Sequence, residues 1–143
     1  MTFDKDSSAG YLVNHMARLF AKGLQDRIAP LGIVIGQFPI LLELWEKDGV
    51  SQRDLLVRLD IEQATLANTL NRMERDGLIK RTKDEADARV QKIWLTAKAV
   101  EIKAQAYQSA NDQNAVALAD LDAAERELFL SLTRRVIGAM RSD

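Results

Sequence analysis

The sequence contains no cysteine, one histidine, seven glycines and two prolines among its 143 residues. Without cysteine the chain forms no disulfide, thiolate zinc site or iron–sulfur cluster. A single imidazole, His15, excludes the usual multi-histidine metal sites and leaves little for a Ser/His/Asp-type mechanism. The carboxylates lack metal-ligand spacing, and no glycine-rich loop is present to hold a phosphate. We therefore expect a protein without a metal or cofactor that is not an enzyme.

Long apolar runs are also missing. The longest segment without a charge covers residues 28–42 and is interrupted by two prolines and two glycines, so it is too short and too kinked to span a bilayer. The amino-terminal sequence MTFDKDSSAG is polar, with neither the basic start nor the apolar stretch of a secretory signal. We expect a cytoplasmic protein with no membrane partner.

The composition is that of one ordinary globular domain over residues 1–143, with 47% hydrophobic and 29% charged residues. The net charge of −1 does not by itself favour nucleic acid. Residues 51–98 carry 10 cations and 8 anions, whereas both flanking segments are negative. This mild asymmetry would allow one surface of the middle third to face phosphate.

Apolar periodicity predicts two helices in the first third of the chain. Intervals of three and four predict a long amphipathic helix from Tyr11 to Ile28, ended by Pro30 and Gly32. A second helix, stopped by Gly49, is apolar on more than one side and should be buried.

Two short helices follow and form a helix-turn-helix candidate. Ser51 and Asp54 have the spacing of a capping box, which predicts the start of the first helix. After a tight turn at residues 60–61, the second helix runs to Asp76, where Gly77 is placed to stop it.

The period changes from helical to strand-like after Gly77. Residues 78–82 and 90–95 predict a β-hairpin whose tip is the charged stretch 83–89. Thr96 can then cap a long helix, and Asp122 with Glu125 begins a last one. The predicted fold is mainly α with a small β-hairpin: four helices, two strands, two helices.

The second helix of the helix-turn-helix pair carries chemistry suited to reading DNA. If Leu66, Leu70 and Met73 point inward, 100° per residue places small, amide and guanidinium side chains outward. These are Ala64, Thr65, Asn68, Asn71, Arg72 and Arg75. Such groups can contact base edges in the major groove, and the helix amino terminus can face a phosphate. The alternative is that this is an ordinary solvated helix face.

The hairpin adds cations along a narrow projection beside that helix. They are Lys80, Arg81, Lys83, Arg89 and Lys92. Arg89, near the tip, is placed to enter a minor groove, and Asp87 could hold its guanidinium. Because Asp84 and Glu85 also lie there, the alternative is a merely solvated turn.

Three short motifs lie in the segment from Asp54 to Thr96: R-x-x-x-x-G-L-I at Arg72–Ile79, D-x-R at Asp87–Arg89 and L-T at Leu95–Thr96. With these motifs, the segment resembles the MarR family of bacterial winged helix-turn-helix transcription regulators. The resemblance implies a DNA-binding lobe over 37–96 and a helical dimerisation lobe formed by 8–31 with 97–143. It further implies a homodimer on a palindromic operator, commonly a repressor relieved by a small-molecule effector.

The resemblance also assigns DNA-binding positions. The family's recognition-helix positions fall on Gln63, Ala64, Thr65, Asn68 and Arg72, and its wing pair falls on Asp87 and Arg89. Asn71, Lys83 and Lys92 join this set from the residue chemistry above. The chain departs from many relatives at Ala67–Asn68, where they have Ser-Arg, at Ala88, where they have arginine, and at Ala99, where they have glycine.

Other interpretations stay open from the sequence alone. His15 could line a ligand cavity or a pH-sensitive dimer contact, or be a partly exposed interface residue. Phe38 and Trp45 could face an aromatic effector, although core packing is the simpler expectation. Trp94 could cover the sheet or touch the DNA backbone. The rival function for the whole chain is a winged-helix module that docks a partner protein without binding DNA.

Overall fold

The computed structural model describes residues 2–141. Its α-helices span Ala9–Ile28 (α1), Phe38–Glu46 (α2), Gln52–Leu59 (α3), Gln63–Arg75 (α4), Ala97–Glu101 (α5), Lys103–Ala117 (α6) and Ala123–Arg141 (α7). Short 3-10 helices cover Lys5–Ser7 (η1), Ala29–Leu31 (η2) and Ile35–Gln37 (η3). The strands are Val50–Ser51 (β1), Ile79–Lys83 (β2) and Gln91–Leu95 (β3). The mainly helical fold with a small β-hairpin is as predicted.

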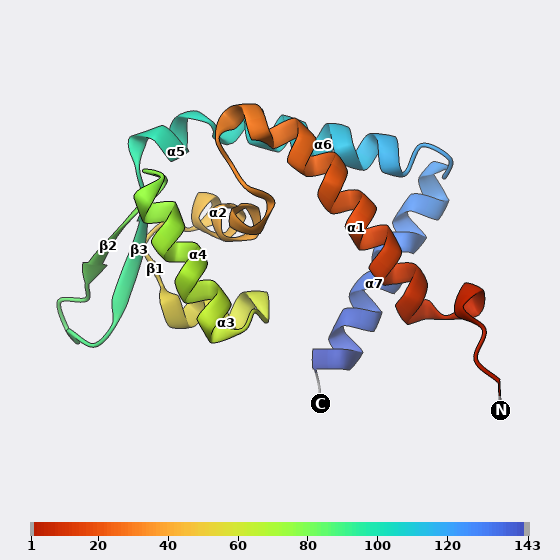
Figure 1. Cartoon of the computed structure of the whole chain (residues 1–143), viewed down its shortest axis with the longest axis horizontal. Coiled ribbons are helices and arrows are strands. Elements are labelled where there is room, and N and C mark those ends of the chain that lie inside the picture. The colour runs from red at the N-terminus through yellow and green to blue at the C-terminus, as the bar shows by residue number, and fades with distance from the viewer. Residues whose placement is uncertain (1, 142–143) are drawn as a thin grey trace.

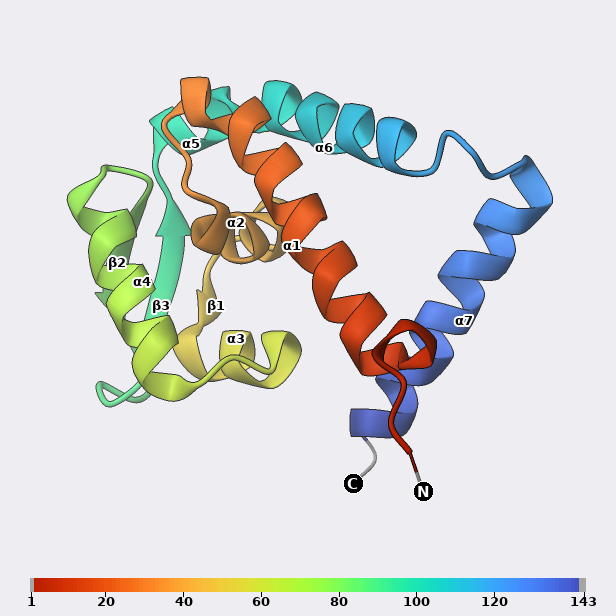
Figure 2. The same cartoon turned by 45° about the vertical axis from the view of Figure 1, so that its right-hand side comes forward.

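The elements form two parts that differ in shape (Figures 1 and 2). Helices α2 to α5 gather around the sheet, whereas α1, α6 and α7 form a long helical frame beside them. Helix α1 packs along α6, and η3 packs against both α2 and α4. The frame therefore meets the sheet-containing part at the end where α1 leads into α2 and α5 leads into α6.

The hydrophobic core lies under α4 and the sheet. Leu66, Leu70 and Met73 are all 0% exposed, so the inward stripe predicted for α4 is confirmed. Burying each such side chain contributes roughly 1.5 to 3 kcal/mol. They pack in one cluster with Leu55 and Ile93, which fixes the opposite face of α4 toward solvent.

Local signals set the ends of several helices as predicted. The Ser51 hydroxyl accepts the Asp54 amide at 3.0 Å, and the Asp54 carboxylate accepts the Ser51 amide at 3.3 Å. Gly77 has a φ of 75°, the left-handed conformation that ends α4 at small cost only for glycine. Thr96 caps α5 by accepting the Ala99 amide at 3.3 Å.

The sheet has three strands in the order β1-β3-β2, all antiparallel. The hairpin pairs Ile79 with Leu95 and Lys83 with Gln91, and its strands begin one residue later than predicted. Strand β1, which pairs Val50 with Ile93, was not predicted. Two residues are too few to show an alternating pattern, so this strand is specified by its contact with β3.

The prediction of a single long helix after Thr96 is wrong, because the helix is interrupted and forms α5 and α6. The break lies at Ile102, whose φ and ψ are −90° and −2°. The Ala99 carbonyl, which a continuous helix would offer to the Lys103 amide, accepts the indole N–H of Trp45 at 3.0 Å. A contact between residues so distant in sequence leaves no periodic signal.

The aromatic side chains have structural surroundings. Phe38 and Trp45 are 4% and 7% exposed and meet edge to face at 6.1 Å, so core packing is confirmed. Trp94 is half-buried, lies over Gly49 and donates its indole N–H to the Thr82 hydroxyl at 2.9 Å. His15 is exposed on α1, with its ring 6.5 Å from that of Tyr11.

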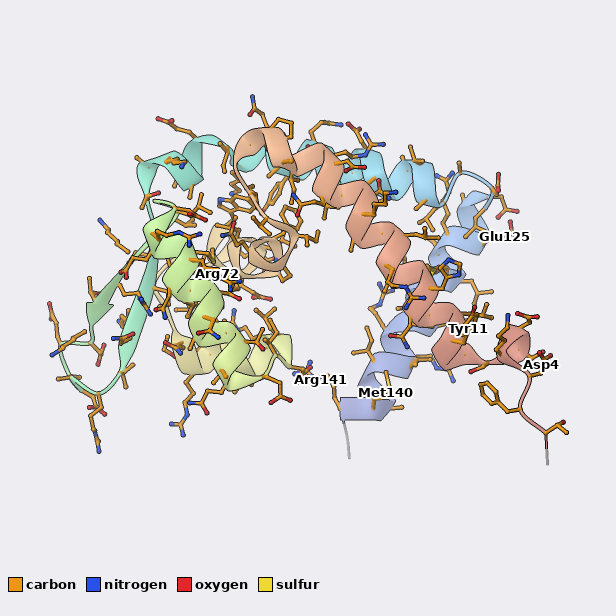
Figure 3. All side chains as sticks on the ribbon, in the orientation of Figure 1. Asp4, Tyr11, Arg72, Glu125, Met140 and Arg141 are labelled. Atoms are coloured by element: carbon orange, nitrogen blue, oxygen red, sulfur yellow. The ribbon has the colours of Figure 1, made fainter. Side chains whose placement is uncertain are left out.

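Helix α7 stands largely apart from the rest of the chain (Figures 1 and 2). At its carboxyl end Arg141 reaches α3, where Nε lies 2.9 Å from Asp60 Oδ2 and Nη2 donates to the Val57 carbonyl at 2.9 Å (Figure 3). The apolar side chains of α1 and α7 are exposed at these residues: Tyr11, Leu12, Val13, Met16, Leu19, Leu128, Leu130, Leu132, Val136, Ile137 and Met140.

Within residues 2–141, no single helix is long and apolar enough to cross a membrane. One pair of helical segments, Ala9–Leu31 and Ile35–Glu46, has the length and apolar composition of a membrane span only when taken together, and the pair is bent by 91°.

Candidate nucleic-acid interface

Helix α4 presents a continuous polar face to solvent. The predicted outward residues Ala64, Thr65, Asn68, Asn71, Arg72 and Arg75 are all exposed, and so is Gln63, which the family resemblance added. Arg72, labelled in Figure 3, lies in the last turn of this helix. No side chain among the described residues caps the amino end at Glu62, so the amides of the first turn remain available to an anion. The face therefore combines side chains that can hydrogen-bond bases with backbone donors for a phosphate.

Arg81 joins the hairpin to α4. Its Nη2 donates to Asn71 Oδ1 at 2.7 Å and to Glu74 Oε1 at 2.9 Å, and its side chain is 19% exposed. The hydrogen bond from Arg81, with its charge, holds the pKa of Glu74 below its ordinary value. Arg81 is one of the cations predicted along the projection beside α4, and its guanidinium is paired with that helix. Arg81 therefore holds β2 against α4, and this contact occupies the side-chain oxygen of Asn71.

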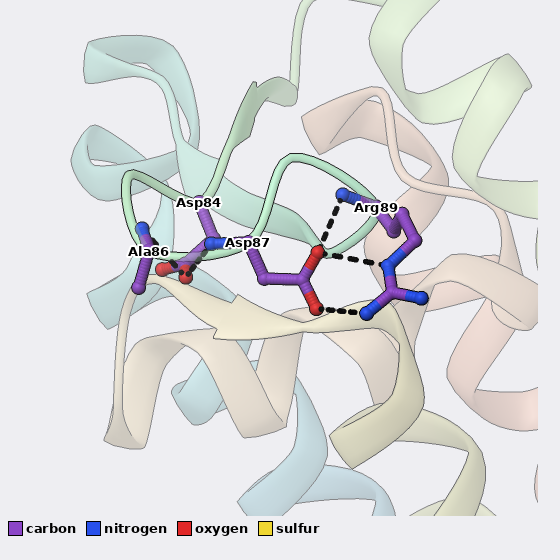
Figure 4. A network of polar contacts seen from close by, with 4 residues as sticks. All are labelled: Asp84, Ala86, Asp87 and Arg89. Carbon is purple, nitrogen blue, oxygen red and sulfur yellow. Dashed lines mark hydrogen bonds and ion pairs between the residues drawn. The ribbon is translucent and has the colours of Figure 1, made fainter.

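The tip of the hairpin holds Arg89 in a defined position (Figure 4). The Asp87 carboxylate accepts Arg89 Nε at 3.1 Å, Nη2 at 3.2 Å and the Arg89 backbone amide at 3.0 Å. These side-chain and backbone hydrogen bonds lower the pKa of Asp87, so it stays ionised at neutral pH. The Arg89 side chain is 91% exposed. The predicted pairing of Asp87 with Arg89 is confirmed, and the guanidinium is both oriented and open to solvent.

Asp84 organises the rest of the tip. Its Oδ2 accepts the amides of Ala86 and Asp87 at 3.2 and 3.1 Å, and its Oδ1 pairs with Lys92 Nζ at 3.3 Å (Figure 4 shows the amide contacts). Lys92 therefore has a carboxylate beside it, and its charge is partly compensated. Lys83, at the end of β2, is exposed.

A groove of about 830 Å³ connects the helices to the hairpin tip. Gln63 of α4 lines it together with Asp87 and Arg89 of the hairpin tip. Gln52 and Arg53 also line this groove and were missed as site residues. The capping pattern at Ser51 places them in the first turn of α3, which is the one signal in the sequence that could have found them.

A second, mainly apolar pocket of about 370 Å³ lies between α1, α2 and α6. Its lining residues are Phe20, Ala21, Leu24, Ile35, Phe38, Leu42, Ala110, Gln113 and Asn114. None of them carries a charge. At one side of this pocket Gly23 of α1 lies against the Gln113 amide of α6, which would have to move aside for a Cβ at that position. Phe38 is thus both a core residue and part of a pocket wall.

The family model that matches is that of the MarR family, over residues 33–90. Transcriptional regulator HosA from Escherichia coli O111:H- is 35% identical over 103 residues, which cover 72% of this chain and 76% of that protein. The fold is similar to the PcaV transcriptional regulator of Streptomyces coelicolor in complex with its natural ligand, with a TM-score of 0.88, 24% identity and coverage of 98% and 99% of the two chains.

A mutant of MarR from E. coli complexed with operator DNA is similar as well. Its TM-score is 0.86 at 22% identity, and the match covers 95% of this chain and 98% of that one. The winged arrangement of α3, α4 and the β2–β3 hairpin agrees with these findings. The chain is a member of the MarR family of winged helix-turn-helix transcriptional regulators.

Proposed function

We propose that the protein binds duplex DNA sequence-specifically, as a homodimer on a palindromic operator, and acts as a ligand-responsive repressor. The observation that carries this proposal is the groove lined both by Gln63, at the amino end of α4, and by the oriented Arg89. A helix face and a thin hairpin with exposed cations that border the same groove suit a major groove and the adjacent minor groove. The MarR structure with operator DNA supports the same use of this fold.

Each part of the interface has a distinct role in this proposal. Gln63, Ala64, Thr65, Asn68 and Arg72 contact base edges in the major groove, while Arg89 enters the minor groove with Asp87 holding it. Lys83 and Lys92 bind phosphates without reading sequence. Asn71 keeps its NH₂ group for DNA while its oxygen anchors Arg81.

The dimer forms through the first and last helices. Both helices expose a series of large apolar side chains, and a second copy is the occupant that the family implies for them. In this division residues 37–96 form the DNA-binding lobe, and 8–31 with 97–143 form the dimerisation lobe. Two lobes per dimer then meet two half-sites about one helical turn apart.

The apolar pocket is the effector site in this proposal. It is lined by apolar side chains and by Gln113 and Asn114, so we expect an uncharged, largely apolar molecule. PcaV, whose fold is similar, was solved with its natural ligand. The protein acts in the cytoplasm by binding rather than by catalysis.

The proposal is tested by selecting DNA from a random duplex pool with the full-length protein. We expect an enriched inverted repeat that is also found upstream of the protein's own gene, and a mobility shift on that DNA that a scrambled duplex does not give. The oligomeric state in the complex is measured by light scattering. A selection without any enriched sequence, accompanied by pull-down of a partner protein on the α4 face, would instead support the protein-docking function.

A further inference from the structure

Gln37 is a buried polar side chain at the junction of the two parts of the molecule. It is 3% exposed, and it lies in η3 between the pocket-lining residues Ile35 and Phe38. A buried amide is costly unless its donors and acceptors are used, so its partners indicate what it holds together.

The two ends of the Gln37 amide join different elements. Oε1 accepts the Val34 amide at 3.0 Å, which fixes the start of η3. Nε2 donates to Asp76 Oδ2 at 3.1 Å. Asp76 is the carboxyl-terminal cap of α4, and its own amide donates to the Arg72 carbonyl at 2.8 Å. The Gln37 side chain thus links the pocket-lining segment, residues 33–38, to the carboxyl end of α4, the helix that carries the proposed base contacts.

The contact at Asp76 is built for an ionised acceptor. Arg75 Nε lies 3.1 Å from Oδ1, and the hydrogen bonds from Arg75 and then Gln37 lower the pKa of Asp76. Lys98 Nζ donates to the Asp76 carbonyl at 2.9 Å. The carboxylate is therefore charged at neutral pH and makes a charge-assisted hydrogen bond with Gln37.

The other side of the pocket-lining segment is held by α1. Gln25 Oε1 accepts the Ile35 amide at 2.7 Å, and Gln25 Nε2 donates to the Ile33 carbonyl at 3.3 Å. Hydrogen bonds thus tie this segment to α1 through Gln25 and to α4 through Gln37. A molecule in the pocket that displaces Ile35 or Phe38 therefore moves the segment as a unit. The Gln37 amide then either pulls on Asp76 or loses its partner.

We propose that Gln37 is a positioning residue that couples occupation of the apolar pocket to the orientation of α4. This rests on the proposed function, in which the pocket receives the effector and α4 reads the operator. Occupation of the pocket shifts η3, weakens the hydrogen bond between Gln37 and Asp76, and releases the carboxyl end of α4. The coupling is the change in the free energy of operator binding that occupation of the pocket causes, and it is measured as a change in the dissociation constant.

The experiment replaces the unidentified effector with a side chain. Ala110→Leu and, independently, Ala21→Leu fill the pocket from opposite walls. Each is combined with Asp76→Ala, which removes the acceptor of the Gln37 amide, or with Arg75→Ala, the matched control that leaves this hydrogen bond in place. Dissociation constants for the selected operator are measured at one salt concentration for all members of the cycle.

We expect filling the pocket to weaken operator binding by about tenfold in the unmodified and Arg75→Ala backgrounds. In the Asp76→Ala background the same change should have an effect of less than about twofold. An equal loss in all three backgrounds would overturn the role of Gln37 while leaving DNA binding itself established. No loss in any background would overturn the coupling as well.

Hydrogen exchange provides a second readout that does not require DNA. The Leu78 amide donates to the Met73 carbonyl at 2.9 Å at the end of α4. Filling the pocket should accelerate its exchange in the unmodified chain and leave it unchanged once Asp76 is alanine. Unchanged exchange at Leu78 in a pocket-filled variant that retains its thermal stability would refute the coupling, even if the protein binds no operator.

Discussion

Replacement of Arg89 with alanine removes a guanidinium that contributes little to the fold. Its side chain is 91% exposed, and its described contacts are all with Asp87 two residues earlier. Exposed ion pairs of this kind contribute little to stability because water and salt screen them. The thermal midpoint of Arg89→Ala should therefore match that of the wild type, so any change in DNA binding comes from the interface.

The expected loss in binding follows from the proposed minor-groove contact. A well-formed groove contact contributes about 1 to 3 kcal/mol, and a dimer uses two wings. The sum, about 2 to 6 kcal/mol, corresponds to a dissociation constant raised about 30-fold at the lower bound. Loss of the charge also reduces the slope of log K against the logarithm of the salt concentration by about one for each wing.

The assay is a titration of the selected operator at two salt concentrations. Arg89→Lys keeps the charge but loses the paired geometry with Asp87, so it should recover the salt dependence and only part of the affinity. Lys47→Ala is the control, because it removes an exposed cation of the same lobe beyond the end of α2. An Arg89→Ala protein with the wild-type dissociation constant, or one no weaker than Lys47→Ala, would refute the assignment of the hairpin to DNA.

Three further predictions concern sequence preference, assembly and acidity. Substitution of Asn68 should change which bases the selection enriches, whereas Lys83→Ala should weaken all duplexes equally; identical effects on matched and mismatched sites would contradict this. Val136→Asp places a charge on the exposed apolar face of α7, and since a twofold interface contains it twice, light scattering should report monomers with weakened operator binding; an intact dimer would show that the interface lies elsewhere. Because Arg81 lowers the folded-state pKa of Glu74, this pair stabilises the protein above the unfolded pKa of about 4.3 and loses its effect as pH falls through the lower folded value. Denaturant unfolding of Glu74→Gln between about pH 3 and 7 should therefore show a smaller loss of stability on acidification than the wild type, and parallel curves would exclude the contribution.

Features that depend on neighbouring residues were predicted from the sequence. The outward face of α4 follows from the helical period once Leu66, Leu70 and Met73 are assigned to the core. The pairing of Asp87 with Arg89 follows from a separation of two residues within a short turn. In both cases the geometry is set within one element, so local rules are sufficient.

Features that depend on contacts between distant elements were not predicted from the sequence. The sequence gives no sign that Trp45 donates to Ala99 and helps to separate α5 from α6. Nor does it show that Arg81 turns toward α4, since an arginine on a strand can face either side of the hairpin. Gln37 is polar and would be expected at the surface, and its hydrogen bonds with the Val34 amide and with Asp76 explain its burial. Each of these depends on packing that brings distant residues together.

The two tryptophans lie in environments that give the protein separate built-in optical reporters. Trp45 is buried against Phe38, a wall residue of the apolar pocket, so its emission should respond when a molecule enters there. Trp94 is half-buried in the hairpin sheet and bonded to Thr82, so quenching of its emission would report events at the wing. Replacing either indole with phenylalanine isolates the signal of the other, which allows both surfaces to be followed by fluorescence without attaching a dye.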